Sequence, residues 1–252
     1  MKILKIGGSF ITRKSGYKEA DIENLQKTAK AIASMWKRGV RDFVLVHGAG
    51  SYGHALVLKY GIDNEVRTEE QKRGYADTHA ACNELSMLVV QALINEGIPA
   101  VSISPATIVE QNNKRISKFN EAIVHEYLKN GFLPVLYGDM VPDSVLGGSV
   151  CSGDQVVAYL AKEAELVVLA TNVDGVLDDS GRLIEKITSS NFSEVAKHLK
   201  KTENDVTGGM EGKLRELLSL RAPSYIVNAA YPERVEALML GKKAVCTEVR
   251  KN

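Results

Sequence analysis

Short apolar runs alternate with amphipathic stretches along almost the whole of this 252-residue chain. The apolar runs are four to six residues long and end at glycine or polar residues, which is typical of buried strands. We expect strands at residues 3–6, 43–46, 100–103, 132–137, 166–170, 225–228 and 244–249. We expect helices at residues 22–38, 69–96, 121–129, 152–164 and 192–199, before residue 221, and from residue 232. This alternation predicts an α/β fold, with a mainly parallel sheet covered by helices on both faces.

The two longest helical segments carry sequence signals at both ends. Asp21 is a candidate N-cap for the first of them, and Gly39 ends it. Apolar side chains recur at helical spacing within it, at Ile22, Leu25, Ala29, Ile32 and Trp36. Residues Thr68 to Gln71 match a capping box, and the helix that begins there is expected to run to about Glu96 and stop at Gly97.

Two stretches show neither helical nor strand periodicity. Residues 110–117 are polar and are expected to form a hairpin or a surface loop. Residues 143–150 contain two glycines, and we expect a loop that separates two lobes. The chain would then consist of one lobe at 1–150 and a second at 151–252, which share one continuous sheet.

Glycine turns follow four of the expected strands, those that end at Ile6, Val46, Tyr137 and Ala170. If these strands are parallel, the four turns meet at one edge of the sheet. Open sheets of this kind bind ligands at the carboxyl ends of their strands, so we expect the functional site there.

The turn after Val46 has the composition of an anion-binding loop. Residues 48–53 contain three glycines and are followed by His54. Glycines let backbone N–H groups approach a ligand, and His54 can donate to a phosphate or transfer a proton. The segment also matches the G-x-G-x-x-G pattern of dinucleotide folds, but it follows the second strand and the nearest acids lie in a loop or a helix start. A purely structural tight turn is the third interpretation.

Lys5 lies inside the first apolar strand, shortly before Gly7, Gly8 and Ser9. A lysine within a buried strand is costly unless its charge is paired. It could belong to an edge strand and point to solvent, or it could be a cation directed at a phosphate. The adjoining glycines favour the second interpretation.

Three further charged residues stand at turns or helix starts. Asp154 falls in the first turn of a helix, where an acid is ordinary for capping, and its functional use would be to hold two lysines in place. Lys213 ends a glycine loop at 205–213, which offers backbone N–H groups and a point charge to a phosphate without matching the Walker A spacing. Asp174 precedes Gly175, and a turn acid is the alternative to a functional one.

Composition excludes several classes of protein. The formal net charge of +1 argues against a nucleic-acid partner. Cys82, Cys151 and Cys246 are far apart and fit neither a zinc site nor a disulfide framework, so we expect a reducing, cytoplasmic environment. The sequence contains no apolar run of 18 residues and its start does not resemble a signal peptide, so no association with a membrane is expected.

Taken in chain order, five of these segments resemble the motifs of the amino acid kinase superfamily. They are Lys5–Ser9, the loop at 48–53, Ser152–Asp154, Val173–Gly175 and Asp205–Lys213. Each is weak by itself, but the ordered set spans nearly the whole chain and is specific. Ile11–Lys14 and Gly50–His54 are in addition similar to the isopentenyl phosphate kinase branch, and fosfomycin kinases share the histidine.

The resemblance implies a three-layer αβα sandwich around a mainly parallel sheet, usually assembled as a homodimer. The amino-terminal lobe would bind the phosphoryl acceptor and the carboxy-terminal lobe would bind ATP. The implied reaction transfers the γ-phosphate of ATP to isopentenyl phosphate, giving isopentenyl diphosphate and ADP in the alternative mevalonate route of isoprenoid biosynthesis. Mg²⁺ would be held mainly by the nucleotide phosphates and water, without a dedicated protein cage.

The resemblance also implies roles for individual residues. Catalysis would depend on positioning and charge, supplied by Lys5, Lys14, His54, Asp154 and Lys213. Lys14 would stabilise the transition state, and Asp154 would organise the lysines. ATP would contact Lys5, Gly7, Gly8, Ser9, Gly50, Asp174, Gly175, Gly209 and Lys213. The acceptor phosphate would contact Ala49, His54 and Gly153, and its apolar tail would contact Tyr75, Thr78, Met140 and Val150.

Two positions depart from the pattern of the superfamily near the expected nucleotide site. Asn172 stands where many relatives have aspartate, and Leu177 where many have tyrosine. Three alternatives stay open: a fosfomycin-type kinase, a nucleotide sensor that does no chemistry, and an NAD-linked dehydrogenase. The retained lysines argue against the sensor, and the position of the glycine loop argues against the dehydrogenase.

Overall fold

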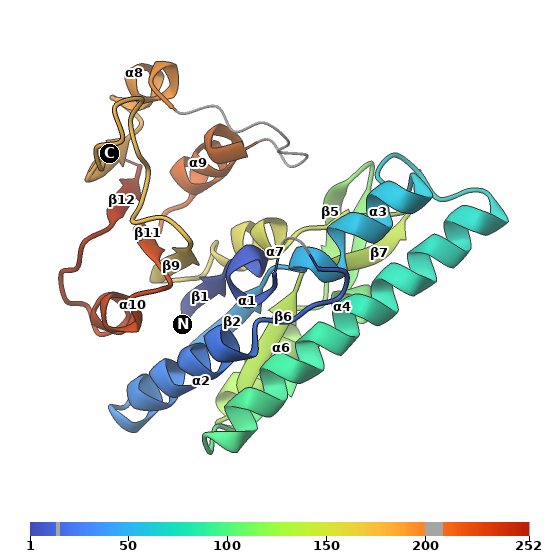
Figure 1. The fold of residues 1–252 in the computed structure, drawn as a ribbon, viewed down its shortest axis with the longest axis horizontal. Coiled ribbons are helices and arrows are strands. Elements are labelled where there is room, and N and C mark those ends of the chain that lie inside the picture. The colour runs from blue at the N-terminus through green and yellow to red at the C-terminus, as the bar shows by residue number, and fades with distance from the viewer. Residues whose placement is uncertain (14–15, 200–208, 252) are drawn as a thin grey trace.

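An eight-stranded, mainly parallel sheet forms the centre of the molecule (Figure 1). The computed structural model describes residues 1–13, 16–199 and 209–251. The order across the sheet is β10 (Lys186–Thr188), β12 (Thr247–Arg250), β11 (Ser224–Asn228), β9 (Leu166–Thr171), β1 (Lys2–Ile6), β2 (Phe43–His47), β6 (Leu133–Tyr137) and β3 (Ala100–Ser102). Only β11 and β12 pair antiparallel among these neighbours. The expected parallel sheet is therefore confirmed.

The middle of this sheet is buried on both faces. Every residue of β2 and of β6 is buried, which explains why their sequences are continuous apolar runs rather than alternating ones. Strands β9, β1, β2 and β6 are parallel neighbours, so their carboxyl ends and the turns that follow lie at the same edge. This is the edge at which the sequence predicts the functional site.

Helices cover both faces of the sheet and complete three layers (Figure 1). One layer contains α2 (Ile22–Lys37), α4 (Glu69–Asn95) and α10 (Pro232–Met239), with the short α1 (Gly8–Ile11) and α3 (His54–Tyr60) beside it. The other contains α6 (Ala122–Lys129), α7 (Gly153–Leu160), α8 (Phe192–Lys197) and α9 (Gly209–Ser219). The αβα sandwich implied by the resemblance is thus confirmed. Among the described helices, none has the length and apolar character needed to cross a membrane.

The helix starts follow the sequence signals. The Asp21 carboxylate accepts the N–H of Asn24 at 3.0 Å, and Thr68 with Gln71 forms a complete capping box at the start of α4. Helix α7 also begins with a capping box, but it ends at Leu160 instead of continuing to residue 164. The chain turns early because the N–H of Glu165 must pair with the carbonyl of Met1 as β9 enters the sheet.

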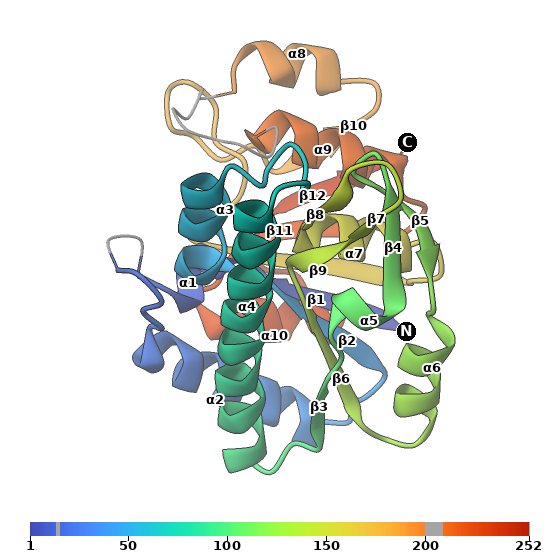
Figure 2. The same cartoon turned by 90° about the vertical axis from the view of Figure 1, so that its right-hand side faces the viewer.

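A second sheet of four strands lies beside the first (Figure 2). Its order is β5 (Arg115–Phe119), β4 (Val109–Asn112), β7 (Asp139–Asp143) and β8 (Gly147–Cys151), and α5 (Pro105–Ile108) leads into it. The hairpin expected at 110–117 is confirmed. The loop expected at 143–150 is wrong, because β7 and β8 pair as a hairpin. Gly147 has φ +82 in its turn, and the Asp143 carboxylate accepts the N–H groups of Val145 and Leu146.

The carboxy-terminal half contains smaller differences from expectation. The short β10 was not expected, and β12 covers residues 247–250 rather than 244–249. Helix α9 already begins at Gly209, so that Lys213 lies within a helix and not at the end of a loop. Residues 205–208 of the expected glycine loop lie outside the described part of the chain.

Candidate active site

Two glycine turns touch at the carboxyl edge of the large sheet. One follows β1 and leads into α1, and the other follows β2 and leads into a 3₁₀ turn at Gly50–Tyr52. A Cβ on Gly8 would lie 2.8 Å from the carbonyl carbon of Gly48, and a Cβ on Gly48 would lie 2.6 Å from the nitrogen of Gly8. Only glycine at both positions lets the backbones approach this closely. Gly7, by contrast, has ordinary room around it.

Thr12 fastens these two turns to each other. Its buried hydroxyl donates to the carbonyl of Gly8 at 2.8 Å and accepts the N–H of Ser51 at 3.0 Å. Gly50 has φ +52, and a side chain there would collide with that of Thr12. Thr12 is not among the residues to which the sequence assigns a role of their own. The available signal was its place in the Ile11–Lys14 segment, which is similar to the isopentenyl phosphate kinase branch.

The backbone nitrogens of Ala49 and Gly153 face a common space. A Cβ on Gly138 would lie 3.2 Å from the Gly153 nitrogen and 3.7 Å from the Ala49 nitrogen. Within the described part of the chain, neither N–H donates to a protein acceptor. Gly153 is also the first residue of α7, where the helix dipole favours an anion. The structure therefore brings together two of the residues predicted to hold the acceptor phosphate.

Lys5 is buried in the middle of the large sheet and pairs with Asp154. Strand β1 lies between β2 and β9, so the edge-strand interpretation is wrong. The Lys5 Nζ lies 2.8 Å from Asp154 Oδ1, and the Lys5 side chain is 9% exposed. Burial lowers the pKa of Lys5, while the Asp154 carboxylate opposes that shift. Burial alone would raise the pKa of Asp154, but the charge of Lys5 and that of Lys213 hold it below its ordinary value.

Lys213 joins this pair from the opposite half of the chain. It lies in the second turn of α9, which packs against α7. Its charge acts on both Lys5 and Asp154, lowering the pKa of each. Asp154 is therefore paired with Lys5 and is also influenced by the charge of Lys213, in keeping with its functional interpretation.

His54 is placed next to the same edge. It is the first residue of α3 and is exposed. Gly53 before it packs so closely on Ala49 that a Cβ would lie 2.7 Å from the Ala49 methyl carbon. The turn therefore brings the start of α3 directly beside the Ala49 amide.

The turn after β9 contacts the first glycine turn. The Ser9 hydroxyl donates to Asn172 Oδ1 at 3.0 Å, so the asparagine that departs from the superfamily pattern has a partner within the site. Asp174 pairs with Arg234 at 2.8 Å and accepts from Asn228 at 3.1 Å. Arg234 was not predicted; its guanidinium also lies 3.9 Å from the ring centre of Tyr231.

For two other predicted ATP contacts, and for the predicted catalytic Lys14, the structure describes no contact of this kind. A Cβ on Gly175 would lie 2.9 Å from the backbone nitrogen of Thr247, so close packing on β12 accounts for this glycine. Gly209 is the first residue of α9. Lys14 lies outside the described residues, and its role stays a prediction.

The residues predicted to contact the apolar tail lie together between α4 and the second sheet. Met140 is fully buried and packs with Ile62 and Val66, and Tyr75 and Val150 pack against this cluster. The Tyr75 hydroxyl donates to the carbonyl of Met140 at 3.3 Å. Thr78 is buried one turn further along α4, where its hydroxyl donates to the carbonyl of Gly74.

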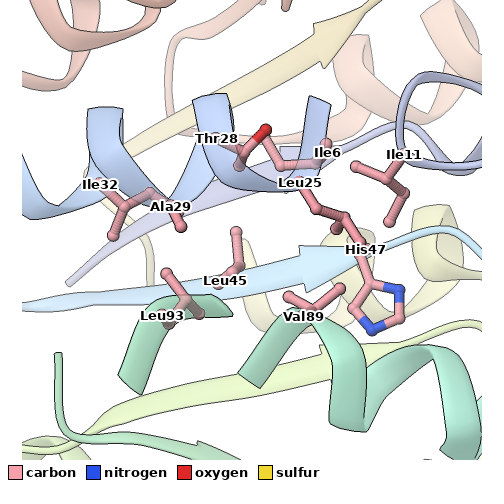
Figure 3. A pocket seen from close by; sticks show the side chains of 10 residues that line it. All are labelled: Ile6, Ile11, Leu25, Thr28, Ala29, Ile32, Leu45, His47, Val89 and Leu93. Carbon is pink, nitrogen blue, oxygen red and sulfur yellow. The ribbon is translucent and has the colours of Figure 1, made fainter. Parts of the chain in front are cut away.

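Two ionisable side chains near the carboxyl edge of the large sheet, His47 and Cys151, belong to the core. His47 faces a small apolar cavity between α2, α4 and β2 and stacks on Tyr137 with ring centres 5.3 Å apart (Figure 3). Burial lowers the pKa of His47 to about 4, so this ring stays neutral at pH 7. Burial also raises the pKa of Cys151 to about 12, which makes its thiol a poor nucleophile.

Comparisons with known proteins agree with this geometry. The model of the amino acid kinase family matches residues 1–224. The chain is 39% identical to the isopentenyl phosphate kinase of Methanothermobacter thermautotrophicus, with 99% of this chain and 98% of the relative covered. It is 31% identical to the isopentenyl phosphate kinase of Methanocaldococcus jannaschii, with 96% of each covered.

Solved structures give the same result. An isopentenyl phosphate kinase solved by X-ray crystallography superposes with a TM-score of 0.84 at 36% identity, over the full length of both chains. The product complex of the Thermoplasma acidophilum isopentenyl phosphate kinase superposes with a TM-score of 0.78 at 26% identity, over 99% of each chain.

The glycine turns, the Lys5–Asp154 ion pair and the αβα sandwich define a nucleotide-dependent phosphotransferase of known architecture, and the chain belongs to the amino acid kinase family. Within that family, its similarity over almost the full length is to isopentenyl phosphate kinases.

Proposed function

We propose that this protein is an ATP-dependent kinase that phosphorylates isopentenyl phosphate, giving isopentenyl diphosphate and ADP. The observation that carries the proposal is one juxtaposition. The Lys5–Asp154 ion pair and the Ala49 and Gly153 amides lie at the same sheet edge, and a cluster of apolar residues around Met140 lies nearby under α4. Such an arrangement suits an acceptor with a phosphate head and an apolar tail. The identity to isopentenyl phosphate kinases supports the same substrate.

Charge neutralisation is the chief task of the site. A transferring phosphoryl group and an ionised acceptor phosphate bring several negative charges together, and preorganised cations lower the cost. Lys5 and Lys213 supply two of these cations, and Lys14 would supply the one that stabilises the transition state. Asp154 keeps the buried Lys5 charged and positioned. An acceptor phosphate is already ionised, so no strong general base is needed.

The two halves of the chain divide the binding. Residues 1–150 bind most of the acceptor, with His54 and the Ala49 amide on its phosphate, and the Gly153 amide at the start of the second half joins them. Residues 151–252 bind ATP. Gly8 and Gly50 let the two glycine turns pack directly on each other. We propose that the backbone of these packed turns contacts the nucleotide phosphates. Asp174, Gly175 and Gly209 complete the proposed ATP contacts, and Mg²⁺ neutralises phosphate charge when the nucleotide is bound.

We call the residues proposed to contact the acceptor's tail, Tyr75, Thr78, Met140 and Val150, the tail site. Its surroundings favour a prenyl phosphate over the fosfomycin-type alternative. Met140 packs in an apolar cluster with Ile62, Val66 and Val150, whereas a small polar acceptor needs polar partners. The product would serve isoprenoid biosynthesis through the alternative mevalonate route. We further propose that the protein acts as a cytoplasmic homodimer, as the resemblance implies.

The test is ADP release from Mg-ATP with isopentenyl phosphate, measured beside fosfomycin, UMP and N-acetylglutamate. Turnover on isopentenyl phosphate alone is the expected result. Turnover on another acceptor would leave the lysine roles intact and refute the prenyl site. ATP binding without turnover on any acceptor would identify a nucleotide sensor instead.

A further inference from the structure

Helix α4 holds the segment 137–140 through three polar contacts at regular spacing. Tyr75, His79 and Asn83 are four residues apart and therefore lie on one face of the helix. They contact Met140, Asp139 and Tyr137 respectively. The contacts run in opposite order along the two segments, as expected where α4 passes beside β6 and β7 (Figure 2). We call these three contacts the α4 ladder.

The middle contact of the ladder is a hydrogen bond between a half-buried histidine and a buried carboxylate. The Asp139 side chain is fully buried, and one of its oxygens lies 2.9 Å from His79 Nδ1. The same carboxylate accepts the N–H of Met140 at 2.8 Å and the hydroxyl of Ser104 at 3.4 Å. His79 Nε2 lies 2.9 Å from the Asn83 amide nitrogen, and Asn83 Oδ1 accepts the Tyr137 hydroxyl. This set of partners assigns the proton to His79 Nδ1 and leaves each of these groups with a partner.

Gly138 is the one residue of the segment that the ladder leaves out. Its neighbours Tyr137 and Asp139 are both fixed to α4, while its own N–H donates to the His47 carbonyl at 3.0 Å. Its missing side chain would point at the nitrogens of Ala49 and Gly153. The ladder thus fixes the residues on both sides of the glycine that borders these two amides.

We propose that Asp139 and His79 are positioning residues for the acceptor phosphate, because they hold Gly138 at the distance that keeps the Ala49 and Gly153 amides open. This inference rests on the proposed function, in which those amides bind the acceptor. The same helix face carries Tyr75 of the tail site, so the ladder also sets the distance between the acceptor's head and its tail. A buried carboxylate such as Asp139 costs free energy of folding that an apolar side chain between β6 and β7 would not cost. The precise placement of Gly138 accounts for the presence of Asp139.

The test uses variants that separate positioning from folding. His79→Leu leaves Asp139 buried without its partner. The double variant His79→Leu/Asp139→Leu removes the buried charge as well, so that packing and folding recover. His79→Asn keeps a donor close to the Nδ1 position. His125→Asn is the matched control, since His125 Nε2 on α6 lies 3.3 Å from Glu163, in a His–carboxylate contact that does not involve α4 or the segment 137–140.

Two readouts are needed, one of them independent of turnover. Steady-state kinetics gives KM for isopentenyl phosphate and for ATP, and calorimetry gives the affinity for inorganic phosphate titrated into the ATP-saturated protein. In the double variant we expect KM for the acceptor and Kd for phosphate to rise about 10–100-fold, because displacements near 1 Å have effects of this size. KM for ATP should change by less than about twofold, and His79→Asn should recover most of the loss.

The outcomes separate this inference from the proposed function. Unchanged acceptor KM and phosphate affinity in the double variant, or equal losses for both substrates, would show that the pair serves folding alone. If the wild type binds phosphate but does not use isopentenyl phosphate, the proposed function fails and the phosphate affinities still decide the role of the ladder. If the wild type binds no phosphate, the inference is overturned.

Discussion

Lys5 illustrates how much a single position leaves undecided in the sequence. A lysine in an apolar strand is compatible with an edge strand or with a buried ion pair, and the choice depends on which strands become its neighbours. Those neighbours include β9, and the partner is Asp154, both far along the chain. The roles of glycines are easier to predict, because Gly8 and Gly48 each lie in a glycine-rich turn after an expected strand. Asp139 and Arg234 gave no signal, and His79 gave only its place on the long helix, since their partners are non-local.

Asp154→Asn should abolish most of the activity. The amide cannot balance the buried charge of Lys5, so the pKa of Lys5, already lowered by burial, falls further. Lys5 then loses its proton at a lower pH than in the wild type, and activity that needs its charge declines at lower pH. We expect kcat to fall by roughly 10²–10³-fold at pH 7 and the basic limb of the pH–kcat profile to move to lower pH.

Glu233→Gln is the matched control for this variant. Glu233 is also an acid in the first turn of a helix, α10, but it is exposed, so its substitution removes only the favourable interaction with the helix dipole. Both variants are compared by steady-state kinetics across the pH range. If Asp154→Asn kept the wild-type kcat and profile, Asp154 would be an ordinary helix-start acid.

At the scale of elements, the sequence predicts best where signals are local. The capping box of α4 and the apolar runs gave the long helices and all strands of the large sheet except β10. The hairpin of β7 and β8 was missed because its short strands carry glycines and a proline and are held by partners in β4 and by the Asp143 side chain. Pairing of that kind depends on tertiary contacts that no local period reveals.

Tyr75→Ala should extend the range of accepted substrates. The Tyr75 ring lies between α4 and β8, so close to Gly148 that a Cβ there would approach it to 2.7 Å. Removing the ring enlarges the apolar site on α4, and we expect turnover on prenyl phosphates longer than isopentenyl phosphate, measured by ADP release across a chain-length series. The variant should also lose roughly 2 kcal/mol of stability.

Tyr159→Ala controls for that loss of stability. Tyr159 stacks on Phe119 with ring centres 4.8 Å apart, in a different apolar cluster. Its removal should lower stability by a similar amount without altering the preferred chain length. A Tyr75→Ala enzyme with the wild-type preference would exclude Tyr75 from the tail site.

At the scale of the whole molecule, the large sheet binds the two halves of the chain into one body. Strand β1 pairs with β2 on one side and with β9 on the other. Helix α2 packs on α10, where Glu236 accepts from Ser34 and pairs with Arg38. The parallel order of the central strands was predictable from the sequence. The division of labour between the two halves is a proposal that rests on the resemblance.

Unfolding should therefore be a single transition. The one tryptophan, Trp36, lies buried on α2 against Phe43 and reports the amino-terminal half, while far-UV circular dichroism reports helices throughout. In urea, the two signals should give the same midpoint, because neither half retains its sheet without β1. Midpoints that differ clearly would show that the halves unfold separately.

The central place of β1 also has a consequence for biosynthesis. Strand β1 is made before both of its neighbours; it can pair with β2 early, but its other edge stays open until β9 has been made. Over the same interval Lys5 has no counter-ion, because Asp154 arrives just before β9. A nascent chain halted between these points presents an unpaired strand edge, and it is in this window of translation that the protein most needs protection from aggregation.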